Sequence, residues 1–496
     1  MKLLYACTEL APLLKTGGLA DVGAALPLAL TAAGCDTRML LPGFAALFNG
    51  VQLDDAPPLM PAGPFAPAVL QQLAQPALIR RGRVAATGQP VYLLDAPALY
   101  QRGGGPYQSA AGEDWPDNAD RFALLGWAAA WLGLGGDTDW RPDVVQLHDW
   151  HAALAPLYLR LMAGDKPRPV SVFTVHNLAY QGLFPADQLP GLGLPWSVFG
   201  IDGLEFYGQL SFMKAGLQFA DAITTVSPRY AQEILTPEQG CRLDGVLRER
   251  ASRVSGILNG VDYAVWNPAT DPLIGARFEH DRLAGKALAR SALQRELGLQ
   301  ERPDALVFGV VSRLSEQKGL HLLPPVLDEL VARGGQLVVL GSGDAGIEAA
   351  LREALAAHGA QGALRTGYDE ALAHRIIAGA DVLLVPSRFE PCGLTQLYAM
   401  RYGTLPLVHG VGGLADTVTD ATPDALAAGR ATGFVFCDFS ADALRGALHR
   451  AFALAERPRE WDAVRRHAMQ QRFDWREAAR AYCALFQRLL TAHPES

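Results

Sequence analysis

Short apolar runs typical of buried β-strands alternate with longer segments of helical periodicity along almost the whole chain. This alternation predicts right-handed βαβ units and parallel sheets, because consecutive parallel strands need a long crossover connection, usually a helix. The pattern starts again in the second half, so we expect an α/β protein with two doubly wound sheets. The strands expected in the first half are Lys2–Cys7, Thr37–Leu41, Val91–Leu94, Val144–Leu147, Val170–Val175 and Ala222–Val226, and those in the second half are Leu306–Val311, Leu337–Leu340, Ala363–Thr366, Val382–Val385 and Leu405–Val408.

The chain length also favours more than one domain, since 496 residues exceed what one hydrophobic core usually organises. We place the break near Ser255–Asp262, where an Asn-Gly pair offers a turn. The predicted domains are therefore residues 1–255 and 256–475. A helical pattern from about Trp475 to Leu490 predicts a C-terminal helix, within residues 476–496, that returns to the first domain.

Composition and charge argue against several kinds of partner. The formal net charge is −8 and there is no run of basic residues, which argues against a nucleic acid or an anionic membrane surface. The six cysteines show no C-x-x-C spacing, which argues against a zinc site and a disulfide framework and indicates a reducing compartment. No apolar run reaches membrane-spanning length. We therefore expect a cytoplasmic protein, whose oligomeric state the sequence does not indicate.

The segment Lys15–Val22 links the first expected strand to a helix expected at about residues 21–33. Strand, glycine turn and helix together place backbone N–H groups in front of a ligand, and Gly17 and Gly18 let the main chain approach it closely. Lys15 adds a point charge suited to phosphate. The alternative is an ordinary turn that needs glycine for a positive φ and carries a solvated lysine.

Two segments of the second half follow expected strands in the same way. Arg313 and Lys318 suit a diphosphate, since arginine binds two oxygens at once and lysine acts as a compact charge. Glu390 precedes a loop-to-helix turn marked by Pro391 and Gly393, whose N–H groups are placed to face an anion. The carboxylate of Glu390 would stabilise developing positive charge or bind a sugar. The alternatives are exposed basic residues on a loop and a glutamate that only caps a helix.

Polar residues also end two expected strands of the first half. His148–His151 ends one strand and Thr174–Asn177 ends the next, so we expect Asp149, His176 and Asn177 at one rim of the first sheet. Two histidines and an aspartate raise the possibility of a metal site. Recognition of hydroxyl groups, with the adjacent tryptophan as a flat face, fits better, because no helical histidine pair or second carboxylate cluster is evident.

Two further loops are rich in glycine. Residues 102–118 form a polar loop that leads into a helix beginning near Asn118, and a loop of this length is functional or mobile. Residues 411–416 repeat the theme of strand, glycine turn and helix, which is weak evidence alone. The chain contains no Gly-x-Ser-x-Gly elbow and no Walker A loop, which argues against hydrolases of those kinds.

Seven segments that span nearly the whole chain resemble the bacterial glycogen synthase and plant starch synthase family. They are Lys15–Val22, His148–His151, Thr174–Gly182, Lys214–Pro228, Asn259–Pro268, Ser312–Gly319 and Ser387–Gln396, in the family's order. The resemblance implies a GT-B fold, with two Rossmann-like domains facing a deep cleft. It also implies transfer of glucose from ADP-glucose to the non-reducing end of an α-1,4-glucan such as glycogen, with retention at the anomeric carbon. No metal or other cofactor is implied.

The resemblance also implies a set of site residues. Lys15 and Gly18 would contact the donor diphosphate from the first domain, and Arg313 and Lys318 would neutralise it from the second. Glu390 would lie near the transferred glucose. The residues predicted to be catalytic are Glu390, Lys318, Arg313, His176 and Asp149. The residues predicted to bind substrate are Lys15, Gly17, Gly18, Asp21, Tyr107, Asn177, Cys392, Gly393, Leu394 and Thr395, with the N–H groups of the last two on the distal phosphate.

Some positions separate this chain from related proteins. Many retaining GT-B enzymes carry a second glutamate eight positions after the first, where this chain has Tyr398, as is usual in the glycogen and starch synthase branch. This argues against relatives similar to sucrose-phosphate synthase. The chain departs from the family pattern at three places. His409-Gly410-Val411 stands where Arg-x-Thr is frequent, so a cation and a hydroxyl are missing. Gln108-Ser109 replaces the common His-Asp, and Arg242 replaces a usual glycine.

Two alternative functions remain open. The first is a retaining GT-B transferase that uses another donor, such as UDP-glucose, or another acceptor. The second is a catalytically weak glucan-binding protein, which the altered segment 409–411 motivates.

Overall fold

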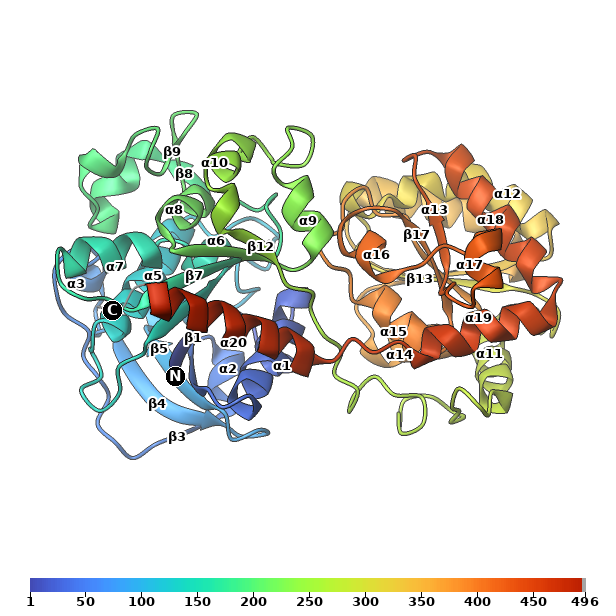
Figure 1. Ribbon diagram of the computed structural model, residues 1–496, viewed down its shortest axis with the longest axis horizontal. Coiled ribbons are helices and arrows are strands. Elements are labelled where there is room, and N and C mark those ends of the chain that lie inside the picture. The colour runs from blue at the N-terminus through green and yellow to red at the C-terminus, as the bar shows by residue number, and fades with distance from the viewer. Residues whose placement is uncertain (493–496) are drawn as a thin grey trace. The chain divides into compact units, whose positions relative to one another are not determined.

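The computed structural model describes residues 1–492, which form two compact α/β units. The first unit contains residues 1–260 together with helix α20 (Trp475–Ala492), and the second unit is Val261–Asp474. The boundary lies within the predicted break at Ser255–Asp262. It falls a few residues beyond position 255, because β12 (Val254–Gly256) still pairs with β11 (Ala222–Thr225) in the first sheet (Figure 1).

The first unit is built on a nine-stranded sheet in the order β12-β11-β7-β6-β1-β2-β5-β4-β3. All six strands predicted in this half are confirmed, and they pair in parallel. The last two strands of the sheet, β4 and β3, run antiparallel and were not predicted. The remaining strands are β1 (Lys2–Ala6), β2 (Asp36–Pro42), β3 (Val51–Leu53), β4 (Leu78–Val84), β5 (Pro90–Asp95), β6 (Val144–His148) and β7 (Val170–Val175). A separate antiparallel sheet has the order β8-β10-β9, from β8 (Leu183–Pro185), β9 (Glu205–Phe206) and β10 (Gln209–Ser211).

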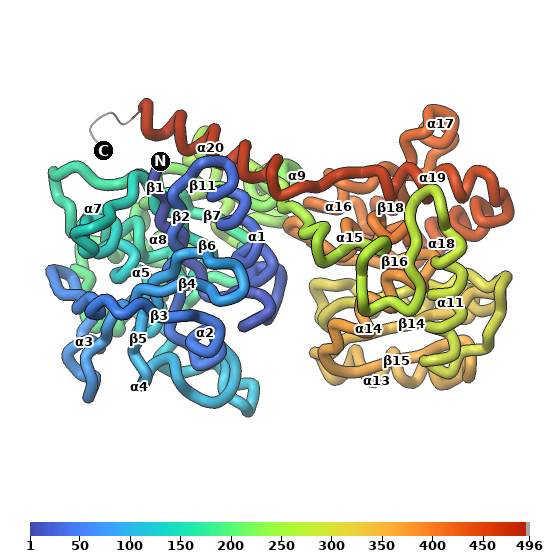
Figure 2. Tube along the Cα trace, turned by 90° about the horizontal axis from the view of Figure 1, so that it is seen from below, coloured from blue at the N-terminus to red at the C-terminus, as the bar shows by residue number. Residues whose placement is uncertain are grey.

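Helices cover both faces of the first sheet (Figure 2). Helix α20 packs against α1 (Gly18–Ala32), while α5 (Asn118–Gly133) packs against α7 (Ala155–Ala163). Helix α5 is buried over almost its whole length, which its run of alanine, leucine and tryptophan allows. The other helices of this unit are α2 (Ala45–Phe48), α3 (Val69–Gln72), α4 (Pro97–Tyr100), α6 (Asp149–Ala152), α8 (Phe212–Phe219), α9 (Pro228–Glu233), α10 (Asp244–Glu249), and the 3₁₀ turns η1 (Ala186–Leu192), η2 (Trp196–Val198) and η3 (Ala251–Arg253).

The second unit is built on a six-stranded parallel sheet in the order β15-β14-β13-β16-β17-β18. The five predicted strands are confirmed as β13 (Val307–Val311), β14 (Gln336–Gly341), β15 (Gly362–Thr366), β16 (Val382–Val385) and β17 (Leu405–His409). The sixth, β18 (Phe434–Phe436), has only three residues and pairs with β17, so its sequence carries too short a pattern to be recognised. The crossover order places β13 beside β16 and brings two of the predicted site segments to neighbouring strand ends.

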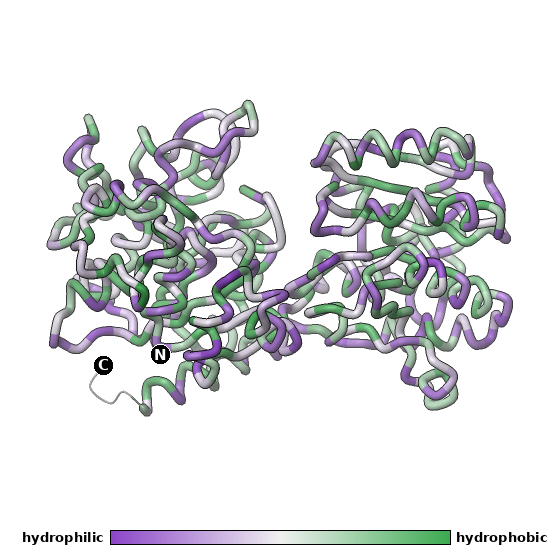
Figure 3. Tube along the Cα trace, turned by 90° about the horizontal axis from the view of Figure 1, so that it is seen from above, coloured by the Kyte–Doolittle hydropathy of each residue, from purple (hydrophilic) through white to green (hydrophobic). Residues whose placement is uncertain are grey.

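Alternate residues of β13 in this sheet belong to different apolar clusters of the core. Phe308 and Val310 belong to one apolar cluster, whereas Val307 belongs to another that includes Leu293 of α11 and Ile376 of α14. The helices are α11 (Ala284–Leu297), α12 (Pro324–Ala332), α13 (Ala345–Ala356), α14 (Glu370–Gly379), α15 (Thr395–Arg401), α16 (Gly412–Thr417), α17 (Pro423–Ala427), α18 (Ala441–Ala455), α19 (Pro458–Gln470), and the 3₁₀ turns η4 (Glu316–Lys318), η5 (Leu320–Leu322) and η6 (Gly359–Gln361). Hydrophobic and hydrophilic residues alternate along the outer helices, as expected for helices with one buried face (Figure 3).

Two further findings concern the helix lengths and the cysteines. Within residues 1–492, no helix combines the length and the apolar character that crossing a membrane requires. The six cysteines are all unlinked thiols, as the spacing of cysteines in the sequence suggested.

We predict that Phe486→Ala lowers the free energy of unfolding of the first unit by about 3–5 kcal/mol, the usual cost of deleting a fully buried aromatic ring. Phe486 is 0% exposed and joins α20 to the core of this unit. The matched control is the neighbouring exposed Gln487→Ala, which should change stability by less than about 0.5 kcal/mol. Urea unfolding followed by circular dichroism measures both, and equal stabilities for the two variants would contradict the docking of α20.

Candidate active site

The predicted glycine turn is organised around a carboxylate that sequence reasoning missed. Glu9 follows β1, and its side chain accepts hydrogen bonds from the backbone N–H of Thr16 at 2.8 Å and of Gly17 at 3.3 Å. The hydroxyl of Tyr107 also donates to Glu9, at 2.7 Å. The N–H groups of Thr16 and Gly17, which we expected to be open to a ligand, are therefore occupied by Glu9. Glu9 is the only acidic residue before Asp21, and that isolation is the one signal in the sequence that marks it.

The rest of this turn contains an ion pair that was not predicted from the sequence. Lys15 forms an ion pair with Asp21 in the first turn of α1, with Nζ 3.0 Å from Oδ1. Gly17 has φ −167°, which any residue adopts, and a Cβ placed on it meets no atom within 4 Å. Neither backbone conformation nor packing requires glycine at position 17. The alternative interpretation of this turn, glycine kept for a positive φ, is therefore wrong for Gly17.

Asp149, His176 and Asn177 meet at the ends of β6 and β7, as predicted from the parallel strands. Asp149 Oδ1 accepts hydrogen bonds from the backbone N–H of His176 at 2.7 Å and of Asn177 at 3.4 Å. His176 Nε2 lies 2.8 Å from His148 Nδ1, so one of these rings donates to the other. Asp149 has a positive φ of 54°, a strained conformation of the kind that concentrates at functional sites.

Burial controls the charges in this group. It raises the pKa of Asp149 to about 7, with the nearby Glu9 adding to the rise and the His176 and Asn177 N–H groups opposing it. It lowers the pKa of His176 to about 3 and that of His148 well below its ordinary value. Both imidazoles are therefore neutral at neutral pH, and Asp149 lies near its titration midpoint. The neutral rings and the protonated form of the Asp149 carboxyl group are suited to bind sugar hydroxyls, because each offers a donor and an acceptor without a net charge to desolvate.

Tyr107 connects the long glycine-rich loop to both groups of residues. Its ring stacks on His151 with centroids 4.4 Å apart, and its hydroxyl contacts Thr8 at 2.8 Å besides Glu9. Burial raises the pKa of Tyr107 well above its ordinary value, so the hydroxyl keeps its proton. The predicted residues of the first unit thus form one connected cluster, centred on Glu9 and Tyr107.

In the second unit the structure brings Lys318 and Glu390 together. Lys318 Nζ lies 2.6 Å from Glu390 Oε2, and the Ser387 hydroxyl donates to the same oxygen at 2.8 Å. Lys318 belongs to η4 after β13, whereas Ser387 and Glu390 follow β16, its neighbour in the sheet. Arg313 is exposed on the same loop as Lys318.

Gly319 is the glycine that this arrangement requires. It has φ +66°, and a Cβ placed on it would lie 1.9 Å from the carbonyl oxygen of Pro386. Any larger residue would push the loop that carries Lys318 away from the loop that carries Glu390.

The predicted substrate-binding run Cys392, Gly393, Leu394 and Thr395 forms the turn into α15. The side chain of Gln396 stabilises this turn, since its Nε2 donates to the carbonyl oxygens of Cys392 at 3.1 Å and Gly393 at 2.9 Å. The turn also rests on the second glycine loop, where the Gly413 N–H donates to the Glu390 carbonyl at 3.0 Å. The weak glycine motif at 412–413 therefore supports the loop of Glu390.

Tyr398 occupies the position of the second glutamate found in many retaining GT-B enzymes. Its ring stacks on Trp266 with centroids 3.9 Å apart and an interplanar angle of 4°, and His374 stacks on the other side of Trp266 at 3.7 Å. The residue is buried and structural, so Glu390 is the carboxylate that this segment presents.

His409, the first residue of the altered segment 409–411, contacts the backbone on both sides of its ring. His409 is buried, with Nδ1 2.8 Å from the Ser387 carbonyl oxygen and Nε2 3.0 Å from the Cys437 carbonyl oxygen. The ring thus holds the backbone of Ser387, whose hydroxyl binds Glu390. Gln108 bonds within its own loop, to Asp114 at 3.1 Å.

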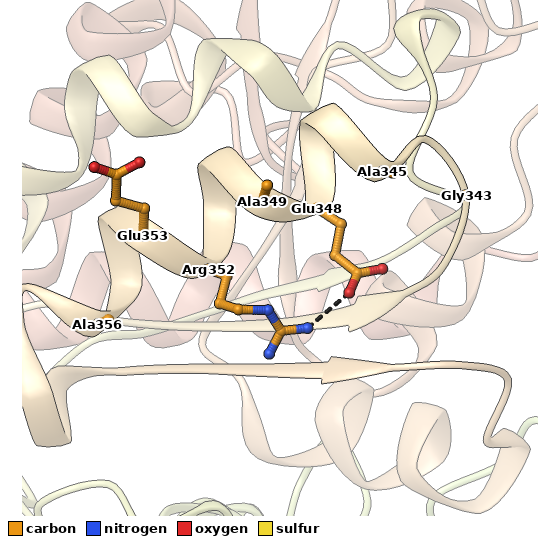
Figure 4. Close-up of a pocket in the computed structure, with 7 residues that line it drawn as sticks. All are labelled: Gly343, Ala345, Glu348, Ala349, Arg352, Glu353 and Ala356. Carbon is orange, nitrogen blue, oxygen red and sulfur yellow. Dashed lines mark hydrogen bonds and ion pairs between the residues drawn. The ribbon is translucent and has the colours of Figure 1, made fainter.

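A hollow in the surface of the second unit lies apart from the predicted site residues. Figure 4 shows a hollow along α13 in which Glu348 and Arg352 point toward each other and pair at 2.7 Å. This hollow is lined by Gly343, Ala345, Glu348, Ala349, Arg352, Glu353 and Ala356, and includes no predicted site residue. Within residues 1–492, no group of three or more histidine, cysteine, aspartate or glutamate side chains is arranged to hold a metal ion.

Comparison with known proteins shows the family of this chain. Residues 2–249 match the starch synthase catalytic domain, and residues 305–452 match the group 1 glycosyl transferases. The glycogen synthase of Albidiferax ferrireducens is 56% identical over 490 residues, which are 99% of this chain and 99% of that protein. The chain belongs to the glycogen synthase and starch synthase family. It is therefore a glycosyltransferase.

Solved structures establish the fold of this family member. The catalytic domain of starch synthase IV from Arabidopsis thaliana, bound to ADP and acarbose, matches with a TM-score of 0.85 and 31% identity over 99% of both chains. The sucrose-phosphate synthase of Thermosynechococcus elongatus matches with a TM-score of 0.58 and 18% identity over 99% of both chains, which shows a shared fold only. The predicted GT-B fold is confirmed.

We predict that the stability of the protein relative to Asp149→Asn falls as the pH rises. Because the pKa of Asp149 is raised from 3.8 to about 7, its contribution is fully present below pH 3.8 and is lost as the pH rises through about 7. Between pH 5 and 8 the difference in free energy of unfolding should fall by about 2–3 kcal/mol. Asparagine keeps the acceptor for the His176 N–H, so it is a matched reference. Urea unfolding of both proteins at the two pH values measures the difference, and a constant difference would show that Asp149 is ionised throughout.

Proposed function

We propose that this glycosyltransferase transfers glucose from ADP-glucose to the non-reducing end of an α-1,4-glucan, with retention at the anomeric carbon and without a metal ion. Two findings support the substrates. The relative described above is a glycogen synthase, and the starch synthase IV structure is bound to ADP and acarbose. The observation that carries the proposal is the Lys318–Glu390 pair, which places a cation and a carboxylate 2.6 Å apart beside a helix-initiating turn.

These charges suit the two ends of the bond that breaks. When ADP leaves, negative charge grows on the diphosphate and positive charge grows at the anomeric carbon of glucose. Lys318 and the exposed Arg313 would bind the diphosphate, and the carboxylate of Glu390 would stabilise the glucosyl centre. The N–H groups of Leu394 and Thr395 would bind the distal phosphate oxygens. Preorganised charges of this kind act without reorganising during the reaction.

The first unit would supply the remaining contacts. We assign Lys15 and the glycine turn to the donor diphosphate, and Asp149, His176 and Asn177 to hydroxyl groups of glucose and of the acceptor. The neutral imidazole of His176 and the half-titrated carboxyl of Asp149 suit such hydroxyls. Trp150 offers an aromatic face beside them.

The test is incorporation of labelled glucose into glycogen from ADP-glucose and from UDP-glucose in parallel, with EDTA present. We expect incorporation from ADP-glucose alone, and release of the label by a β-amylase, which cleaves only α-1,4 links from non-reducing ends. Glu390→Gln keeps the shape of the side chain but removes its charge. This variant tests the role of the carboxylate, and its kcat should fall at least about 100-fold. Preference for UDP-glucose would overturn the donor assignment. Loss of activity with EDTA would overturn metal independence.

We predict that Gly17→Ala raises the KM for ADP-glucose by about tenfold or more while leaving stability nearly unchanged. A methyl group at position 17 points into open space and needs no unusual backbone angle, so it harms only a ligand that approaches the turn. Gly319→Ala is the contrasting variant, because its Cβ meets the Pro386 carbonyl and its φ is positive. It should lower thermal stability as well as activity. An unchanged KM in Gly17→Ala would show that the donor does not contact this turn.

A further inference from the structure

Three residues with unusual backbone conformations meet on the surface of the first unit. Within residues 1–492, five residues other than glycine have a positive φ, and three of them are Tyr207 at 51°, Cys241 at 49° and Arg242 at 65°. These conformations cost free energy in residues with a Cβ, and they persist only where the surrounding structure holds them. Tyr207 and Arg242 come from segments far apart in the sequence, so their meeting is not explained by one strained turn.

Together these residues form an exposed aromatic and cationic platform. Tyr207 lies at the turn between β9 and β10 and is 71% exposed. The guanidinium carbon of Arg242, which is also exposed, lies 5.4 Å from the centroid of the Tyr207 ring. An exposed tyrosine ring contributes little to the stability of a fold. Here, however, Tyr207 and Arg242 both adopt a strained backbone conformation that places the ring beside the guanidinium. We call Tyr207 and Arg242 the Tyr–Arg platform.

The platform is attached to the segment that carries the candidate active site. Gln181 donates from Nε2 to the carbonyl oxygen of Cys241 at 2.9 Å, and Gln181 belongs to the same segment as His176 and Asn177. The next residue, Gly182, lies against Trp150, because a Cβ on it would be 2.3 Å from that ring.

The antiparallel sheet makes a second connection between the platform and the site. Trp150 contacts Phe184 of β8 with ring centroids 5.9 Å apart. Strand β8 pairs with β10, and β10 pairs with β9, which leads directly to Tyr207. The Tyr–Arg platform is thus connected to Trp150 through this small sheet, and to the segment of His176 through Gln181.

We propose that the Tyr–Arg platform binds glucose units of the α-glucan acceptor next to those that enter the active site; this rests on the proposed function. A glucan chain is neutral and presents C–H faces and hydroxyl groups in alternation along each unit. A tyrosine ring packs against such a face, and a guanidinium donates several hydrogen bonds to hydroxyl oxygens. The platform offers both in fixed positions, which lowers the entropy lost on binding a flexible chain.

The test compares three variants for elongation of glycogen. Arg242→Gly removes the guanidinium and suits the positive φ, and Tyr207→Asn removes the ring and tolerates this conformation. Cys241→Gly is the matched control, because it changes the backbone of the same turn and keeps both platform side chains. We expect the KM for glycogen to rise about five- to tenfold in the first two variants and to stay unchanged in the control. The KM for ADP-glucose should stay unchanged in all three, and the melting temperature of Arg242→Gly should not fall.

A second measurement separates this inference from the proposed function. Migration of each protein through a native gel containing glycogen reports glucan binding without catalysis. Wild-type retardation that is lost in Arg242→Gly and Tyr207→Asn supports the platform even if no glucose is transferred, in which case the proposed function alone fails. An unchanged KM for glycogen and unchanged retardation in both variants would overturn the platform. Equal changes in both KM values, together with a lower melting temperature, would also overturn it, since they would show a structural role.

Discussion

Parallel pairing of strands decides which side chains can meet in each unit. Strands β1, β6 and β7 are neighbours that run the same way, so Glu9, Asp149 and His176, which follow their carboxyl ends, reach one edge of the sheet. In the second unit β13, β16 and β17 are neighbours, and the same geometry brings together Lys318, Glu390 and His409. Each cluster comes from segments far apart in the sequence. Crossover helices make this possible, because each parallel strand restarts from the opposite edge of the sheet and ends at the edge where these side chains meet.

The carboxylates of Glu9, Glu390 and Asp149 have different hydrogen-bond and ion-pair partners, and their chemical properties follow from that difference. Glu9 accepts from two backbone N–H groups and from Tyr107, so it organises the glycine turn as a structural centre. Glu390 has a cation and a hydroxyl on one oxygen. Asp149 accepts hydrogen bonds from two backbone N–H groups and, among residues 1–492, has no cation beside it. Because the side chain is buried, its pKa rises to about 7. The first unit thus holds a fixed acceptor and a group that can hold or release a proton near neutral pH, whereas the second unit holds an ion-paired carboxylate.

The parts of the fold that could be predicted are those with a repeated pattern. Continuous apolar runs such as Val170–Val175 identified the parallel strands, because both of their faces are buried. Strand β4 was missed because its sequence, Leu-Ile-Arg-Arg-Gly-Arg-Val, is interrupted by arginines that an antiparallel strand near the sheet edge tolerates. In the site, Lys318 and Glu390 could be chosen from their places after strands. Glu9 and the supporting role of His409 could not, since both depend on contacts between loops that only the folded chain brings together.

The Lys318–Glu390 pair is better explained by function than by stability. Removing both charges from water costs about as much free energy as their attraction returns, so a largely buried pair adds little net stability. Three features of the chain nevertheless hold this pair in place: Gly319, the Ser387 hydroxyl, and His409, which contacts the Ser387 carbonyl oxygen. A stable sheet needs none of these. A reaction that separates a negative diphosphate from a positive glucosyl centre needs a cation and a carboxylate held in advance at a short, fixed distance. On the proposed function, the contacts that hold the pair are therefore explained by the transfer reaction and not by the stability of the second unit.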